Sequence, residues 1–86
     1  MKNRHFGKFE IDSKIISEDP DLIIDAFSII RFLPVRAESL LSNSSIEYIG
    51  ISERFEEVAM GTQIPEYKII ITRDERGITV EVKRAD

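Results

Sequence analysis

The sequence contains no cysteine and a single histidine among its 86 residues. Without cysteine, neither a disulfide framework nor a thiolate zinc site can form, so the fold must be stable without such cross-links. The lack of cysteine also suits a reducing compartment, and we expect the protein in the cytoplasm. His5 stands alone in the sequence, and metal sites and general-base pairs need convergent partners, so it predicts neither.

Long hydrophobic runs are absent as well. The longest apolar stretch, residues 22–33, is interrupted by Asp25, Ser28 and Arg31 and is too short and too polar to span a membrane. Residues 1–5 are basic, but no apolar segment of secretory length follows them. We therefore expect no signal peptide and no membrane association.

An excess of basic charge is also missing. The formal net charge is −4, and affinity for a phosphate backbone comes mostly from lysine and arginine, so direct binding of nucleic acid is not expected. Hydrophobic residues make up 42% and charged residues 33% of the chain, a globular composition. We expect one small domain over residues 1–86, in which residues 1–5 can be disordered.

The common motifs of catalysis and cofactor binding do not occur. There is no G-x-G-x-x-G, Walker loop, EF-hand or H-E-x-x-H. The close acidic pairs, Glu56 with Glu57 and Asp19 with Asp21, have ordinary interpretations as a solvated loop and a helix N-terminus. We therefore predict no catalytic, cofactor or metal-binding residues, and an enzyme only if loops of two subunits build a shared site.

The clearest local signal is a helix start at Asp19, Pro20 and Asp21, with a capping acid, a proline at the first helical position and an acid in the first turn. Apolar residues then recur at helical spacing: Leu22, Ala26, Ile29, Ile30 and Leu33. Pro34 disfavours helical geometry at Leu33. We expect a kink or break there and a second helical piece that runs to about residue 42.

The other half of the chain is typical of strands. Alternating or β-forming residues predict strands over 6–12, 46–52, 67–72 and 78–82, the last two joined as a hairpin by the polar turn 73–77. Gly50 interrupts the second of these strands and indicates a bulge or a close backbone approach. The predicted fold is α+β, a three- to four-stranded antiparallel sheet with the broken helical region on one face, in the order (β)-α-α-β-β-β.

Three isoleucines, Ile49, Ile51 and Ile70, fall out of phase with the main apolar face of their strands. Strands that are apolar on both sides are usually covered on both sides, and one helical layer covers only one face of a sheet. We therefore predict a homo-oligomer, with a dimer favoured, in which a second subunit meets the other face or an edge strand.

The most distinctive segment lies between the two tyrosines, Tyr48 and Tyr67. It has two interpretations: a loop whose Phe55 plugs the end of the core, or a recognition loop. For the second, tyrosine and arginine are enriched in binding hot spots. The predicted binding residues are Tyr48, Arg54, Phe55, Tyr67 and Arg73.

The stretch from Tyr48 through Gly50, Phe55, Gly61 and Pro65 to Tyr67 carries a resemblance. Residues 46–84 resemble a segment of small uncharacterised accessory proteins of bacteriophages and prophages. The resemblance implies a protein that acts stoichiometrically, by blocking a host enzyme, by mimicking nucleic acid or by sequestering a signalling molecule. It assigns no residue a role.

Together these observations favour a non-enzymatic, inhibitor-type binding protein that acts through an unknown protein partner. The alternative is a protein that binds or sequesters a nucleotide-like anion at a subunit interface. That site would combine Arg54, Arg73 or Arg76 with Tyr48 or Tyr67 through ion pairing and stacking.

Overall fold

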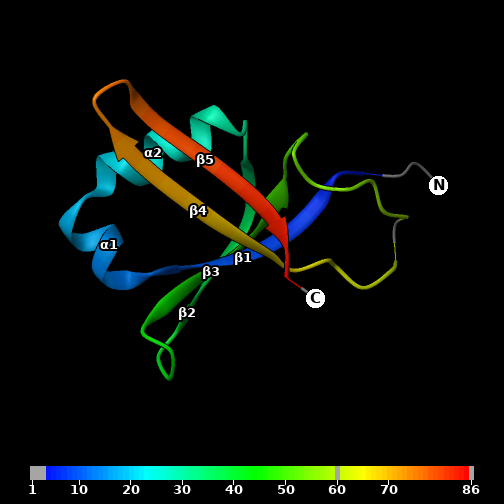
Figure 1. Ribbon diagram of the computed structural model, residues 1–86. Coiled ribbons are helices and arrows are strands. Elements are labelled where there is room, and N and C mark those ends of the chain that lie inside the picture. The colour runs from blue at the N-terminus through cyan, green and yellow to red at the C-terminus, as the bar shows by residue number, and fades with distance from the viewer. Residues whose placement is uncertain (1–3, 60, 86) are drawn as a thin grey trace.

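The structure, a computed structural model, describes residues 4–59 and 61–85 (Figure 1). These residues form two helices and five strands, namely β1 (Phe6–Asp12), α1 (Ser13–Glu18), α2 (Pro20–Ile29), β2 (Leu33–Leu40), β3 (Ser45–Ile51), β4 (Tyr67–Asp74) and β5 (Gly77–Arg84). All strand pairs within the two sheets are antiparallel. The predicted α+β class is confirmed.

Both helices begin at an aspartate. The side chain of Asp12 accepts a hydrogen bond from the Lys14 N–H group at 2.8 Å, and that of Asp19 accepts one from the Leu22 N–H group at 3.3 Å. Pro20 is the first residue of α2, as its sequence predicts. The helical region is therefore broken at Asp19, between α1 and α2, and not at Pro34.

The second helical piece predicted between Pro34 and residue 42 is wrong, because Leu33–Leu40 form strand β2. The helix ends earlier, where Arg31 adopts a left-handed conformation with φ of 52°. The Phe32 N–H group donates to the Phe27 carbonyl at 2.8 Å and completes this turn. β2 is an edge strand, where a proline is tolerated, and the strand bulges between Pro34 and Arg36.

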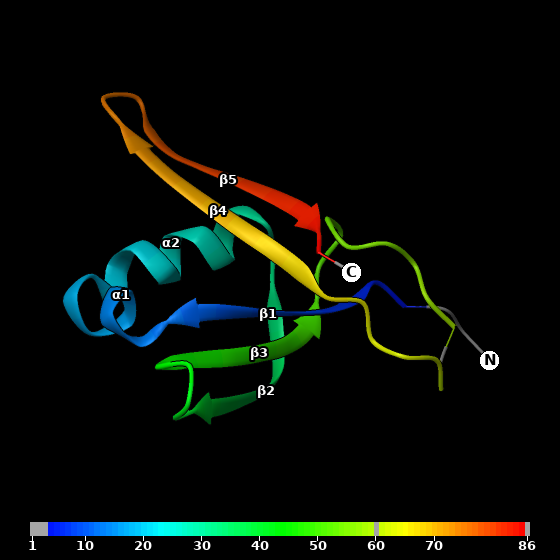
Figure 2. The ribbon, with the colours of Figure 1, turned by 60° about the horizontal axis from the view of Figure 1, so that its bottom comes forward.

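The strands form two sheets where a single sheet was predicted. One sheet has the order β1-β3-β2, and β4 and β5 form a separate hairpin. The two sheets are bridged where the Lys8 N–H group donates to the Pro65 carbonyl at 3.0 Å, beside a parallel bridge between Lys8 and Glu66. β1 and β4 diverge from this point, and α2 lies between the hairpin and the three-stranded sheet (Figure 2).

The core lies where α2 meets both sheets. α2 and its C-cap contribute Ile23, Ala26 and Ile30, which pack with residues of β1, β4, β5 and the loops. The buried apolar residues in the described chain are Phe9, Ile11, Ile23, Ala26, Ile30, Phe32, Phe55, Tyr67 and Val80. Phe9 is at the centre, with ring centroids 4.8 Å from Phe32 and 5.8 Å from Phe27. The helical layer therefore covers one face of the three-stranded sheet, as predicted.

The opposite face of this sheet carries the out-of-phase isoleucines. Ile49 and Ile51 alternate with Tyr48 and Gly50, which lie opposite Phe9 and Gly7 on the core side. Ile49 and Ile51 thus lie on the outer face, where they are half-buried, and Ile70 is half-buried on the hairpin opposite Glu81. No helix in the described residues has the length and apolar character needed to cross a membrane.

Candidate functional site

A loop of irregular structure, residues 52–66, joins β3 to β4 and runs beside the start of β1 (Figure 1). Its first residue, Ser52, is only 1% exposed. The Ser52 hydroxyl donates to the Ile30 carbonyl at 2.6 Å and accepts from the Arg54 N–H group at 3.1 Å. The loop is thereby fixed to the end of α2 before it leaves the core.

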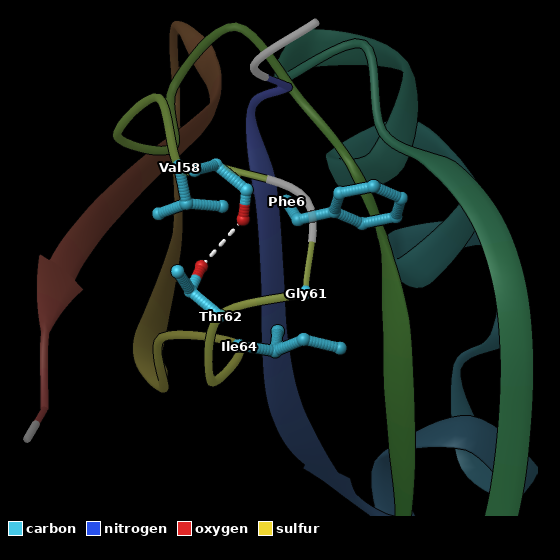
Figure 3. Close-up of a pocket in the computed structure, with 6 residues that line it drawn as sticks. Phe6, Val58, Gly61, Thr62 and Ile64 are labelled. Atoms are coloured by element: carbon cyan, nitrogen blue, oxygen red, sulfur yellow. Dashed lines mark hydrogen bonds between the residues drawn. The ribbon is translucent and has the colours of Figure 1, made fainter. Parts of the chain in front are cut away.

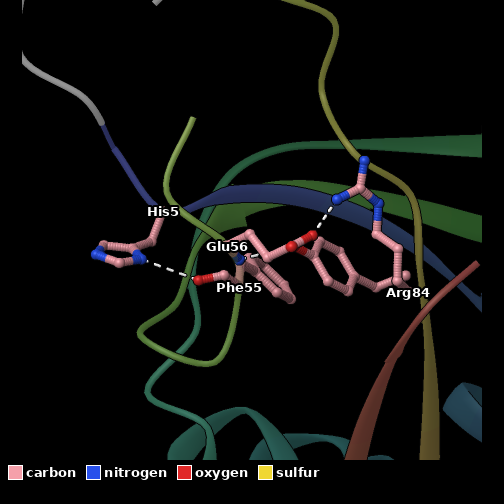
Figure 4. A network of polar contacts seen from close by, with 5 residues as sticks. His5, Phe55, Glu56 and Arg84 are labelled. Carbon is pink, nitrogen blue, oxygen red and sulfur yellow. Dashed lines mark hydrogen bonds and ion pairs between the residues drawn. The ribbon is translucent and has the colours of Figure 1, made fainter. Parts of the chain in front are cut away.

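Phe55 and Tyr67 hold the middle of the loop. Their side chains are buried, and the rings stack with centroids 4.5 Å apart and an interplanar angle of 19°. The Tyr67 hydroxyl accepts a hydrogen bond from the Glu56 N–H group at 2.7 Å. The Glu56 carboxylate forms an ion pair with Arg84, whose guanidinium lies 5.9 Å from the Tyr67 ring centroid (Figure 4).

The start of the described chain supports the loop from the other side. Nδ1 of His5 is hydrogen-bonded to the Phe55 carbonyl at 2.9 Å (Figure 4). Arg4 and Val58 exchange two backbone hydrogen bonds of 2.9 and 2.8 Å. Arg4 and His5 are thus part of the fold, whereas residues 1–3 of the segment predicted to be disordered lie outside the described residues.

The tip of the loop forms an apolar pocket against the first residue of β1. The pocket has a volume of about 190 Å³ and is lined by Phe6, Val58, Ala59, Gly61, Thr62 and Ile64 (Figure 3). The Thr62 hydroxyl donates to the Ala59 carbonyl at 2.5 Å, which satisfies the polar group of the lining. Gly61 adopts φ of 89°, a conformation that glycine accepts without strain. The pocket thus offers an apolar surface beside the start of β1.

The five predicted binding residues do not share one surface. Phe55 and Tyr67 are in the core, as in the plug interpretation of the loop. The Tyr48 ring is half-buried, with its centroid 5.0 Å from that of Phe27, and this burial raises the pKa of its hydroxyl. Arg54 is exposed on the loop, and Arg73 forms an ion pair with Asp19 at 3.0 Å, at the start of α2.

The arrangement that the anion alternative needs is not present within one described chain. The Tyr67 ring stacks on Phe55 and its hydroxyl is engaged by the loop backbone. Arg76 lies in the hairpin turn with Arg73, at the end of β4 remote from Tyr67 (Figure 1). Any such site would require residues of a second subunit, and it stays a prediction.

Sequence reasoning missed half of the residues that line the pocket. Val58, Gly61 and Ile64 belong to the segment that it singled out, but Phe6 was assigned only to a strand, and Ala59 and Thr62 drew no attention. The available signal was Gly61 between apolar residues, since an isolated glycine marks a turn. What the sequence does not show is that β1 runs alongside that turn.

Within residues 4–59 and 61–85, no group of three or more histidine, aspartate or glutamate side chains is placed to hold a metal ion. Comparisons with protein-family models, with curated proteins and with solved structures found nothing that matches this chain. Function must therefore be inferred from the geometry of the loop and its pocket.

Proposed function

We propose that the protein is a non-enzymatic binding protein whose loop, residues 52–66, docks on a partner protein. The observation that carries this proposal is the apolar pocket of about 190 Å³ between Phe6 and the loop tip. Small-molecule sites usually measure about 300–1,000 Å³, so this pocket fits a single apolar side chain better than a whole ligand. Pockets filled by one anchoring side chain are typical centres of protein interfaces.

The charge of the loop restricts the kind of partner surface that can bind to it. Glu53 and Glu57 precede the pocket-lining residues of the loop in sequence, and Arg54 is the loop's one basic residue. Glu56 is already paired with Arg84. Charge complementarity steers association and disfavours wrong partners. The expected partner surface therefore carries an apolar anchor residue flanked by lysine or arginine.

The loop is also prepared for binding before a partner arrives. Ser52, Phe55 and Tyr67 fix its base through buried hydrogen bonds and ring stacking. Ordering a flexible loop at an interface costs free energy, and a preorganised loop avoids most of that cost. This rigidity supports a recognition role for the loop tip even though Phe55 itself serves as a plug.

The resemblance of residues 46–84 to phage accessory proteins supports a role for this binding in the contest between a phage and its host. We infer a phage-encoded, stoichiometric inhibitor that acts in the bacterial cytoplasm on a host protein of the kind described above. Inhibition by occupation needs no catalytic residues in the inhibitor.

The pocket is tested by an affinity capture from bacterial lysate with Ala59→Phe, which adds a ring to a residue that lines the pocket. The parent protein should retain a specific partner at a fixed stoichiometry, and the variant should retain about tenfold less, since filling the pocket removes an anchor site. Thr79→Phe, which adds the same ring at an exposed position of β5, should bind as the parent does. Circular dichroism should show that both variants are folded.

Equal capture by Ala59→Phe and the parent would show that the pocket is not the docking site. Failure of the parent to retain any specific protein would overturn the proposal as a whole. The anion alternative predicts instead a stabilisation of about 2.7 kcal/mol by a nucleotide at 100 times its dissociation constant. Under the proposal, a thermal-shift screen of nucleotides should find no such effect.

A further inference from the structure

The edge of the three-stranded sheet at β2 is open. β2 is the outer strand in the order β1-β3-β2, and each of its residues except Leu40 is exposed (Figure 2). An exposed edge strand presents unpaired backbone groups to which another strand can bind. The question is which strand fits it.

The register identifies the backbone groups that point outward. Hydrogen bonds from Ser52 to His5 and from Ser13 to Ser44 show that the even-numbered residues of β3 face β1. The odd-numbered residues of β3 therefore face β2, where Ile49 and Glu47 lie opposite Arg36 and Glu38. Since backbone groups alternate along a strand, the N–H and C=O groups of Ala37 and Ser39 turn to the open edge.

We propose that two copies of this chain dimerise by antiparallel pairing of their β2 strands about a two-fold axis at Ala37, which joins the two three-stranded sheets edge to edge. In this register Ala37 exchanges its backbone hydrogen bonds with Ala37 of the second copy. Ser39 lies opposite Val35 of the second copy.

Charge complementarity selects this register. With the axis at Ala37, Arg36 lies opposite Glu38 of the second copy, and the same pair recurs on the other side of the axis. These residues are at non-hydrogen-bonded positions, where opposite side chains come closest. In each copy Arg36 and Glu38 already form an exposed ion pair of 3.6 Å, so both side chains lie on the same face of the strand.

Neighbouring symmetric registers are disfavoured. A shift of two residues in one direction places Arg36 opposite Arg36 of the second copy, and the opposite shift places Glu38 opposite Glu38. Like charges directly opposite each other on a sheet destabilise the pairing. A shift of one residue would match outward-facing backbone groups with inward-facing ones.

Exposed apolar side chains give a second, independent argument. In the described chain the exposed large apolar residues are Ile15, Ile24, Ile29, Leu33, Val35 and Leu41, and half of them belong to β2 or the residue after it. Leu33 is 63% exposed and Leu41 is 90% exposed, one at each end of the open edge. Burial of these side chains would favour the dimer.

The interface is small. Pro34 has no N–H group and the strand bulges beside it, so regular pairing is limited to the region around residues 35–39. Interfaces below about 1,200 Å² are typical of weak or transient complexes. We therefore expect a monomer at low concentration and a dimer as the concentration rises.

The proposal is tested by exchanging the charges of Arg36 and Glu38 and measuring dimerisation by sedimentation equilibrium. Arg36→Glu and Glu38→Arg each place like charges opposite each other twice and should each weaken dimerisation by at least about tenfold, through direct repulsion and loss of the ion pairs. The double variant with both substitutions restores opposite charges and should recover the dimer. Arg36 and Glu38 are exposed in each copy. Unchanged circular dichroism should confirm that the variants fold.

The chain offers a matched control on another edge strand, β5. β5 carries Glu81 and Lys83 two residues apart, in an ion pair of 3.5 Å, but none of the large exposed apolar side chains. Lys83→Glu should leave dimerisation unchanged. A parent protein that stays monomeric at all concentrations, single variants at β2 that dimerise as the parent does, or a double variant that fails to recover would each overturn the proposal.

Hydrogen exchange gives a readout that does not depend on any variant. The amides of Ala37 and Ser39 should become protected as the protein concentration rises, because the pairing uses their outward N–H groups. The amide of Val82, in the middle of β5, should show no dependence on concentration. The reverse pattern would place the contact on the hairpin and refute the assignment to β2.

Discussion

Ser52 is a small polar residue with a large share in positioning the loop. Its hydroxyl is buried, donates to the Ile30 carbonyl at 2.6 Å and accepts from the Arg54 N–H group. Ser52→Ala leaves both backbone groups without this partner, and we expect a loss of about 1–3 kcal/mol in the free energy of unfolding, measured by urea denaturation. Ser17→Ala removes an exposed hydroxyl and should change stability by less than about 0.5 kcal/mol. Equal losses in the two variants would show that the buried hydrogen bonds of Ser52 contribute no more to stability than an exposed hydroxyl does.

Tyr48 gives the stability a dependence on alkaline pH. Burial raises the pKa of its hydroxyl above the ordinary value of 10.0, so the folded state holds the phenolic proton more tightly than the unfolded state. The unfolded state then binds fewer protons above pH 10, and the free energy of unfolding falls as the pH rises through the folded pKa. Tyr48→Phe should lessen this fall in urea denaturation curves recorded from roughly pH 9 to 12, which extends above the ordinary tyrosine pKa. A variant with the parent's pH profile would contradict the assignment.

Gly50 predicts a close backbone approach but not the strand that makes it. An interruption of a strand by glycine indicates a bulge or a close approach, and a Cβ atom at Gly50 would lie 2.3 Å from the Leu33 carbonyl oxygen. The bulge is in the neighbouring strand, between Pro34 and Arg36. The close approach could thus be foreseen, but the identity of the approaching strand could not.

At the scale of elements, α2 and the hairpin are connected through Asp19. Its side chain caps α2 at the Leu22 N–H group and forms the ion pair with Arg73 near the end of β4. Asp19→Ala should cost about 0.5–2 kcal/mol for the lost cap. Asp19→Asn keeps a capping oxygen and loses the charge of an ion pair that is partly exposed, so it should cost less than about 1 kcal/mol. Thermal and urea unfolding of both variants measure the difference, and equal losses would mean that the cap contributes little.

Elements with local signals were predicted well. The aspartate and proline at the start of α2, the strand near residues 6–12 and the hairpin around the 73–77 turn are specified by residues adjacent in sequence. β2 was missed because Val35, Ala37 and Leu40 fit a helix as well as a strand. In addition, the turn after α2 contains Arg31, a non-glycine residue with positive φ. The stop signal in that stretch is Pro34, and it predicts a break at Leu33, two residues after the observed turn at Arg31.

At the scale of the whole molecule, the pairing between distant segments escaped prediction. β1 joins the two sheets through Lys8 and Pro65, and its Phe6 forms one side of the pocket. These contacts depend on how β1 and β4 diverge around α2, which no periodicity within either strand encodes. The candidate site was therefore predicted in its segment but not in its composition.

The placement of α2 between the sheet and the hairpin also affects how the protein is made. Ile30, at the end of α2, shares the core with Val80 of β5, which a ribosome adds about fifty residues later. At roughly 5–20 residues per second, the nascent chain waits several seconds with this side of the helix uncovered. During synthesis the apolar side of α2 is thus open to chaperones until β5 emerges.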